Sequence, residues 1–297
     1  MESGLVRVSL EAVVVAVTDD RPRILTLPSD GSTVVLPSGL LHVEDDATLE
    51  LAMRRLIAEQ AGLSVGYVEQ LYTFGDRNRS RRRGRGEPRT LGVAYLVLTR
   101  EATTPGRWAD WYHLFPWEDR RRGGRDVPVA EAIQAWAAGD EDRARRVRIA
   151  FGIADTPWDG VRALERYELM YEARLVPEWF VDHDQSVPEG LPGGEPMGFD
   201  HRRVAATALS RLRGKLTYRP VVFELLPETF TLSHLRRTVE ALAGQRVHPQ
   251  NFRRLVERGG LVEGTGSAVT TGGRPAELFR FRHEVLTERP RVGVGRP

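Results

Sequence analysis

Cysteine is absent from the 297 residues, so the chain has no disulfide bond, no thiolate nucleophile and no cysteine-bound zinc or iron–sulfur cluster. Long apolar runs are absent as well. The longest one near the start, residues 10–17, is far shorter than the ~18–20 residues that a membrane helix needs. One arginine precedes it, and Asp19 and Asp20 follow it, a charge pattern that argues against a secretory signal peptide. We therefore expect a cytoplasmic protein with no membrane partner.

Lysine is nearly absent, because Lys215 is the single lysine among 43 basic residues. The charge is also unevenly distributed along the chain. Residues 201–297 contain 18 basic and 8 acidic residues, whereas residues 1–200 contain 25 basic and 33 acidic residues. A basic last third attracts polyanions, nucleic acid above all. The simpler interpretation, a solvated surface in an arginine-rich protein, stays open at this point.

The first hundred residues alternate between strands and one helix. Apolar and β-branched residues predict strands over five segments: 6–17, 23–27, 33–36, 67–74 and 91–99. Apolar residues recur at helical spacing over 47–61, and Gly62 follows as a stop, so a helix is predicted there. This order indicates an α+β unit, which we assign to residues 1–106.

The middle of the chain has a different composition. All six tryptophans lie between Trp108 and Trp179. Apolar periodicity predicts three helices, over 127–138, 141–152 and 158–175. We therefore assign residues 107–198 to a helical, tryptophan-rich insertion.

The last third, residues 199–297, contains three predicted helices followed by two short strands. Asp200 and Thr231 precede the first two helices as caps, and Pro249 opens the third. Residues 261–263 and 278–282 flank a loop rich in glycine and threonine and are predicted to pair as a hairpin. Three helices followed by a hairpin is the order of a winged helix, a variant of the helix-turn-helix.

The third helix of this unit has the composition of a DNA-reading element. We expect its apolar residues Phe252, Leu255 and Val256 to face inward. Its other side then presents glutamine, asparagine and arginine, the residue types that read adenine and guanine in the major groove. The candidate base and phosphate contacts in and just before the helix are Arg246, His248, Gln250, Asn251, Arg253 and Arg254. An ordinary exposed face of a protein-contact module is the alternative.

Residues 36–63 resemble a Nudix box, a loop–helix–loop whose glutamates hold the divalent ions that activate water against a pyrophosphate. Aligned from its end, the segment places Arg55 and Glu59 as the box does, whereas Leu56 and Gln60 stand at two glutamate positions and Ala47 falls at the third, more distant one. One of the four carboxylates remains, too few for a Mg²⁺ site. We therefore predict a Nudix-like fold that has lost hydrolysis, holds no metal or cofactor, and still binds a nucleotide.

A degenerate Nudix box and a C-terminal winged helix together resemble the NrtR family, the Nudix-related transcriptional regulators of NAD metabolism. The matching residues in the C-terminal third keep the order and spacing of the family over about 85 residues: Phe199–His201, Leu212–Tyr218, Leu225–Leu232, Asn251–Arg254 and Gly273–Phe281. The N-terminal match covers residues 5–100, and residues 107–198 match nothing in the basic family pattern.

The resemblance implies a homodimer that binds a palindromic operator in double-stranded DNA as a repressor of NAD metabolism genes, with ADP-ribose as its nucleotide effector. It adds Arg213 and Lys215 as DNA contacts, and it supports Arg274, which lies at the tip of the predicted wing in the loop 265–275 and is a candidate on that ground as well. The candidate effector contacts are Gly39, Arg55, Glu59, Gln60, Phe74 and Asp76. The implied fold class is α+β: an N-terminal Nudix-like α/β/α domain with a helical insertion, then a C-terminal winged helix-turn-helix.

Two other functions stay open from the sequence. One is a Nudix hydrolase of ADP-ribose or a related nucleoside diphosphate derivative, with some activity left despite the missing carboxylates. The other is an adaptor that binds neither DNA nor nucleotide. Under the regulator hypothesis, the helix between Asp200 and Gly214 joins sensor and reader, and its rotation would change the spacing of the DNA half-sites.

Overall fold

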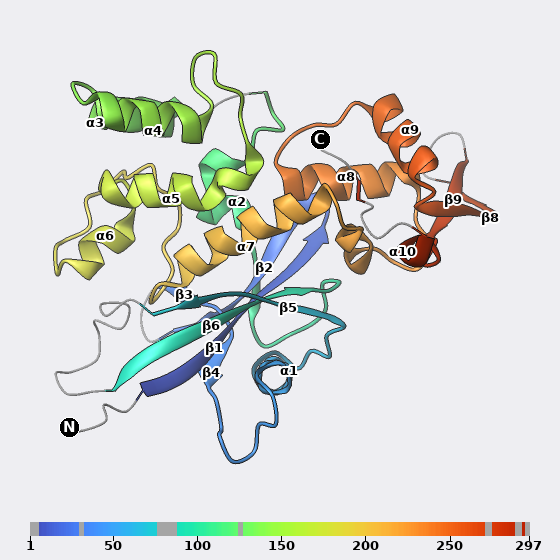
Figure 1. Ribbon diagram of the computed structural model, residues 1–297, viewed down its shortest axis with the longest axis horizontal. Coiled ribbons are helices and arrows are strands. Elements are labelled where there is room, and N and C mark those ends of the chain that lie inside the picture. The colour runs from blue at the N-terminus through green and yellow to red at the C-terminus, as the bar shows by residue number, and fades with distance from the viewer. Residues whose placement is uncertain are drawn as a thin grey trace.

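The computed structural model describes residues 6–29, 33–75, 88–123, 127–270, 275–288 and 293–294. Its central element is a mixed sheet (Figure 1). Helix α1 (Leu49–Ala61) covers one face of this sheet, and helix α7 (His201–Leu216) crosses the other. The N-terminal part is therefore a layered α/β/α arrangement, as the sequence predicts.

Among the described residues, seven strands form this sheet in the order β3-β2-β1-β6-β5, with β4 paired to β1 and β7 paired to β2. Strands β1 and β6 run parallel, and the other pairs are antiparallel. The strands are β1 (Val6–Thr18), β2 (Arg21–Pro28), β3 (Val34–Val35), β4 (Ser38–Leu40), β5 (Tyr67–Phe74), β6 (Arg89–Leu98) and β7 (Arg107–Asp110).

Strand β1 has a valine-rich sequence because it is buried on both faces. Successive side chains of a strand point to opposite faces, so Ala12 and Val14 pack with α1, whereas Val13 and Val15 pack on the opposite side. The apolar core on the side of Val13 and Val15 is the larger of the two. It continues from the sheet through the middle segment and α7 into the C-terminal unit, so these parts share one apolar core.

The middle segment consists of short helices stacked beside α7 (Figure 1). In chain order they are α2 (Trp111–Leu114), η1 (Pro116–Glu118), α3 (Val127–Ala137), α4 (Glu141–Phe151), η2 (Gly160–Arg162), α5 (Ala163–Glu172) and α6 (Pro177–Asp182). The helix predicted over 158–175 is interrupted, because the Asp159 side chain caps the separate turn η2 before α5 begins.

The predicted start of the insertion at residue 107 is wrong. Residues 107–110 form β7 and pair with β2 in the register Leu25↔Trp108 and Ile24↔Ala109, so they belong to the sheet. The helical segment instead begins with α2. A strand of four residues has too short an alternation to be detected by pattern, and the composition alone places Trp108 with the other tryptophans.

The C-terminal unit has the order that the sequence predicts. It comprises α7, η3 (Val221–Leu225), α8 (Leu232–Ala243), α9 (Pro249–Gly259), β8 (Val262–Val269), β9 (Ala276–Phe281) and α10 (Val285–Glu288). The hydroxyl of Thr231 accepts a hydrogen bond from the amide of His234 and caps α8. Asp200 precedes α7, but its side chain makes no cap hydrogen bond. Among the described residues, no helix is long and apolar enough to span a bilayer.

Candidate nucleic-acid interface and effector site

Helix α9 presents the polar face that the sequence predicts for a reading helix. Proline at its first turn and Gly260 in the left-handed conformation (φ 61°) define its ends. Phe252 and Val256 are buried, four residues apart. Leu255, predicted to face inward, is 39% exposed, so the buried stripe is narrower than expected. The exposed polar residues of the helix are Gln250, Asn251, Arg253, Arg254, Glu257 and Arg258.

Two hydrogen bonds along α9 orient its arginines. The Nη2 of Arg254 donates to the Oδ1 of Asn251 over 2.8 Å, and the Nε of Arg253 donates to Glu257 over 2.7 Å. The first bond links two side chains of the types that read guanine and adenine. The bond uses the oxygen of the Asn251 amide as its acceptor and holds the two side chains together on the exposed face.

The residues before α9 are exposed, as predicted, and one of them is anchored. His248 and Arg246 are both exposed. The Nε of Arg246 donates to the carbonyl oxygen of Arg121 over 2.7 Å, which holds this guanidinium beside the turn between α8 and α9. The wing arginine, Arg274, lies outside the described residues.

Arg213 is wrongly predicted as a DNA contact, because the structure buries it. It is 5% exposed, and its Nη1 pairs with the carboxylate of Glu118. Its Nε donates to the carbonyl oxygen of Leu242 over 3.0 Å. A guanidinium held in this way cannot reach a phosphate without breaking a buried ion pair.

Lys215 is also engaged inside the protein. Its ammonium pairs with Glu69 of β5 and lies 3.3 Å from the hydroxyl of Tyr67, and the side chain is 13% exposed. Lys215 thus joins the end of α7 to the sheet and does not face outward as a DNA contact would. Both errors have one cause: the basic residues of α7 were assigned from family position, whereas their acidic partners lie far away in sequence.

Glu118 is the centre of a buried ion cluster that the sequence does not reveal. Arg166 donates to its two oxygens over 2.5 and 2.8 Å, and Arg213 pairs with the same carboxylate. Burial alone raises the pKa of Glu118, but the two guanidinium groups outweigh burial and hold that pKa below its usual range. The carboxylate is therefore charged at neutral pH and joins η1, α5 and α7.

The same cluster contacts the end of α8. The hydroxyl of Tyr112 donates to the carbonyl oxygen of Ala241 over 2.6 Å, beside the bond from Arg213 to Leu242. These carbonyls belong to the last turn of α8, where no helical partner is available. Gly244, which closes α8 at φ 70°, packs so closely that a Cβ there would collide with the carbonyl oxygen of Glu118.

Apolar and amide side chains fill the space of the Nudix-like box. A Cβ added to Gly39 would lie 2.5 Å from Cδ2 of Leu56, so the leucine packs directly on the glycine. Gln60 accepts from the amide of Ser38 over 3.1 Å and donates to the carbonyl of Ser38 over 2.8 Å. Leu56 and Gln60 thus hold α1 against β4. Among the described residues, no group of three His, Asp or Glu is placed to hold a metal ion.

Arg55 keeps a structural ion pair in the box. Its Nη2 lies 2.7 Å from Asp46, and its Nη1 lies 3.0 Å from Glu59. The hydrogen bond from Arg55 lowers the pKa of Asp46 to about 2. The arginine therefore joins the middle of α1 to the preceding loop, and Glu59, one turn further along α1, is its second partner.

Removing Arg55 should make the free energy of unfolding less dependent on pH in the acid range. The pKa of Asp46 is depressed in the folded state, so the Asp46–Arg55 pair contributes fully above the unfolded value of 3.8 and is lost as the pH falls towards about 2. In a double-mutant cycle of Arg55→Ala and Asp46→Asn, urea unfolding should give a coupling energy that shrinks from pH 6 to pH 2. A coupling energy that does not change with pH would contradict the ion pair.

Phe74, a further effector candidate, lies on the other face of the sheet from α1. Phe74 ends β5 with its side chain 6% exposed in the core, in an edge-to-face contact with Tyr72. Asp76 lies outside the described residues.

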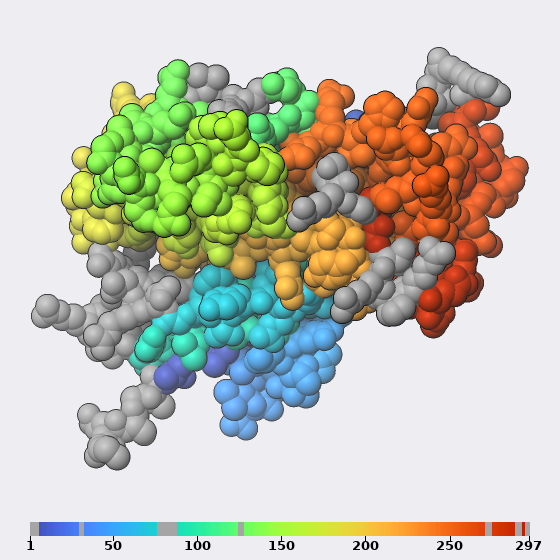
Figure 2. All heavy atoms as spheres, turned by 45° about the horizontal axis from the view of Figure 1, so that its top comes forward, coloured from blue at the N-terminus to red at the C-terminus, as the bar shows by residue number. Residues whose placement is uncertain are grey.

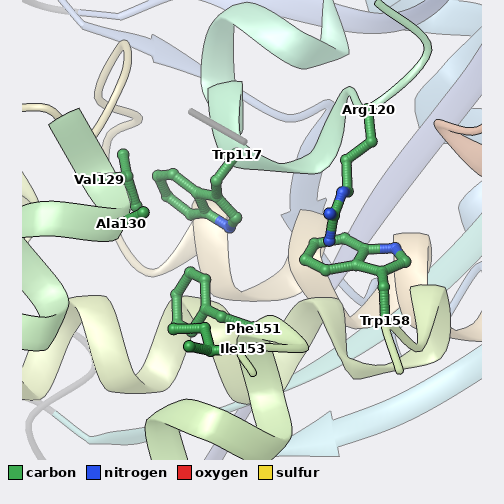
Figure 3. Close-up of a pocket in the computed structure, with 7 residues that line it drawn as sticks. All are labelled: Trp117, Arg120, Val129, Ala130, Phe151, Ile153 and Trp158. Atoms are coloured by element: carbon green, nitrogen blue, oxygen red, sulfur yellow. The ribbon is translucent and has the colours of Figure 1, made fainter. Parts of the chain in front are cut away.

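A separate pocket lies in the middle segment, lined by Trp117 and Trp158 among others (Figure 3). The guanidinium of Arg120 lies over the ring of Trp158, and Trp117 faces the same space. Its volume of about 20 Å³ has room for about one water molecule, so a nucleotide does not fit in this conformation.

Comparison with known proteins identifies the C-terminal unit. Residues 222–281 match the family model of the NrtR DNA-binding winged helix domain. The ADPR responsive transcriptional repressor NtrR of Acinetobacter baylyi is 35% identical over 85 residues, which are 29% of this chain and 34% of the relative. The match therefore spans about a third of the length of that relative.

Solved structures of similar fold cover nearly the whole chain. NrtR of Shewanella oneidensis, crystallised with a 27mer DNA, aligns with a TM-score of 0.56 at 22% identity over 94% of this chain and 95% of that one. The same protein without DNA aligns with a TM-score of 0.58 at 21% identity, and the alignment covers 96% of this chain and 97% of that one. A MutT/nudix family protein of Enterococcus faecalis gives 0.56 at 14% identity over 95% and 88%. The predicted resemblance and the predicted fold class are thereby confirmed.

Proposed function

We propose that this chain, whose residues 222–281 match the NrtR winged helix family, is a DNA-binding transcriptional repressor with a non-catalytic Nudix-like sensor. The observation that carries the proposal is the exposed face of α9, where the Asn251–Arg254 pair stands on a helix whose opposite side is buried. A helix of this kind enters the major groove and reads base edges with its side chains. Arg253, Gln250, His248 and Arg246 would then contact bases or phosphates beside the pair.

The proposed operator is palindromic and the proposed repressor is a homodimer, because two winged helices must match two half-sites. Helix α7 is the proposed lever. It is buried along the sheet and continues into the core of the winged helix, so a rotation of α7 would change the spacing of the two reading helices. We divide the chain accordingly into a sensor (1–110), a helical segment (111–198) and a reader (199–297).

The proposed effector is a nucleotide, with ADP-ribose first, since the Acinetobacter baylyi relative is named as ADPR responsive. The proposal extends to NAD metabolism genes as targets and to the cytoplasm as location, both carried over from the family resemblance. Hydrolysis is not expected. Leu56 and Gln60 stand at positions where the Nudix box places metal-binding carboxylates, and they contact Gly39 and Ser38 there.

Fluorescence anisotropy tests both halves of the proposal. Purified protein is titrated into labelled DNA from upstream of its own coding sequence, with scrambled DNA as competitor and with or without ADP-ribose. We expect tight, competitor-resistant binding that ADP-ribose changes, and no Mg²⁺-dependent loss of ADP-ribose in the same mixture. Equal affinity for specific and scrambled DNA would contradict the regulator, and Mg²⁺-dependent hydrolysis would favour the hydrolase alternative.

A further inference from the structure

The loop that follows η1, residues 119–123, is fastened to the turn that leads into α9. The amide of Arg120 donates to the carbonyl oxygen of Gly244 over 2.7 Å, and the Nε of Arg246 donates to the carbonyl oxygen of Arg121 over 2.7 Å. One bond runs in each direction, so the loop and the turn are paired through backbone and side chain. Figure 2 shows that the middle segment (green) and the C-terminal unit (orange) meet along one continuous face.

The conformation of this loop is fixed from within. Arg121 makes two hydrogen bonds to Asp119, over 2.8 and 2.9 Å, and the Asp119 carboxylate also accepts from the amide of Arg121 over 3.1 Å. The guanidinium of Arg121 lies 5.2 Å from the ring centroid of Tyr112 and donates to the carbonyl oxygen of Asp20. The loop is therefore ordered before any partner binds, which lowers the entropic cost of an interaction.

The three arginines of the loop have different environments. Arg121 is taken up by Asp119, and Arg120 lies over Trp158 (Figure 3). Arg122 is exposed. It directly follows the residue whose carbonyl accepts from Arg246, so the backbone of Arg122 lies next to the guanidinium of Arg246, an exposed arginine from a distant part of the chain.

We propose that Arg122 contacts the DNA backbone beside the half-site read by α9, so that the middle segment is part of the DNA-binding surface. This inference rests on the proposed function and extends its interface beyond the winged helix. Three observations support DNA as the occupant. The loop borders the turn before the reading helix, where phosphate contacts gather. Its exposed charge is positive, and it continues the basic edge that Arg246 begins.

The expected contribution is electrostatic and independent of sequence. Each phosphate that a cation neutralises contributes about 0.9 to the slope of log K against log salt. Arg122→Ala should therefore lower the magnitude of this slope by about 0.9. It should also lower the affinity for specific DNA and the affinity for scrambled DNA by the same factor. Between 50 and 200 mM salt, the wild type should lose about threefold more affinity than the variant. Arg122→Lys keeps the charge and should keep the slope.

Arg145→Ala is the matched control. Arg145 is an exposed arginine of α4, its side chain is 62% exposed, and it lies at the end of the molecule opposite α9 (Figure 1). Arg145→Ala lowers the net charge by the same amount as Arg122→Ala, so a general effect of net charge would appear in both variants.

The experiment is anisotropy of full-length wild type and the three variants over four salt concentrations. An unchanged slope for Arg122→Ala, with salt-dependent binding by the wild type, would overturn this inference and leave the proposed function standing. Equal losses in Arg122→Ala and Arg145→Ala would also overturn it. A wild type without salt-dependent DNA binding would refute the proposed function together with the inference.

Discussion

Glu118→Gln is expected to lower the free energy of unfolding by about 3–5 kcal/mol, because it leaves two arginine cations buried with no opposite charge. Glu118 and Arg166 are fully buried, and Arg213 is nearly so. An amide fills the same volume and accepts one hydrogen bond, but it does not compensate the charge. For a protein stabilised by roughly 5–15 kcal/mol this is a large fraction of the total.

Glu172→Gln is the matched control for this variant. Glu172 also pairs with an arginine of the middle segment, Arg146, over 2.6 Å, but both side chains are 42% exposed. Solvent screens such a pair, so the control should change stability by less than about 1 kcal/mol. Urea unfolding followed by circular dichroism gives both values.

Tyr112→Phe keeps the test decisive if Glu118→Gln does not fold. It removes the hydroxyl that donates to the carbonyl of Ala241 and accepts from Arg213, and should cost about 1–3 kcal/mol because the carbonyl in the last turn of α8 loses its partner. Amide hydrogen exchange should then rise over 241–248 before it rises in β1. A loss under 1 kcal/mol in both variants would show that the cluster contributes little to holding the winged helix in place.

Arg254→Ala is expected to weaken binding to the operator by about 1–3 kcal/mol, or roughly five- to 150-fold, and to relax the preference for one base pair. Arg254 stands on the exposed face of α9 and is held by the Oδ1 of Asn251. Loss of the guanidinium removes two directed donors and frees the asparagine to turn. A contact with a base edge discriminates sequences, whereas a contact with a phosphate does not.

Arg258→Ala provides the control on the same helix. Arg258 is also exposed and carries the same charge, but it lies in the last turn of α9. Anisotropy against operators changed at single positions should show lost discrimination at one position for Arg254→Ala and at none for Arg258→Ala. If Arg254→Ala weakens all sequences equally, Arg254 contacts the backbone, and another residue of α9 reads the base.

The contrast between Arg254 and Arg213 shows how far local pattern predicts a site. Both are arginines on predicted helices of the basic unit. The position of Arg254 follows from α9 itself, since its exposed face is the one opposite Phe252 and Val256. Arg213 is turned inward by Glu118, which lies 95 residues earlier in the chain. The sequence near α7 does not predict that Glu118 is its partner.

Local signals in the sequence predict the extent of β5, the cap of α8 at Thr231 and the start of α9 at Pro249 correctly. These depend on backbone preference and on side-chain periodicity within a few residues. Three other features are visible only in the folded chain: β7 joins the sheet, Leu56 packs on Gly39, and the loop after η1 borders the turn before α9. Contacts between distant segments depend on tertiary packing, and local patterns in a single sequence do not predict which of its many charged residues form ion pairs.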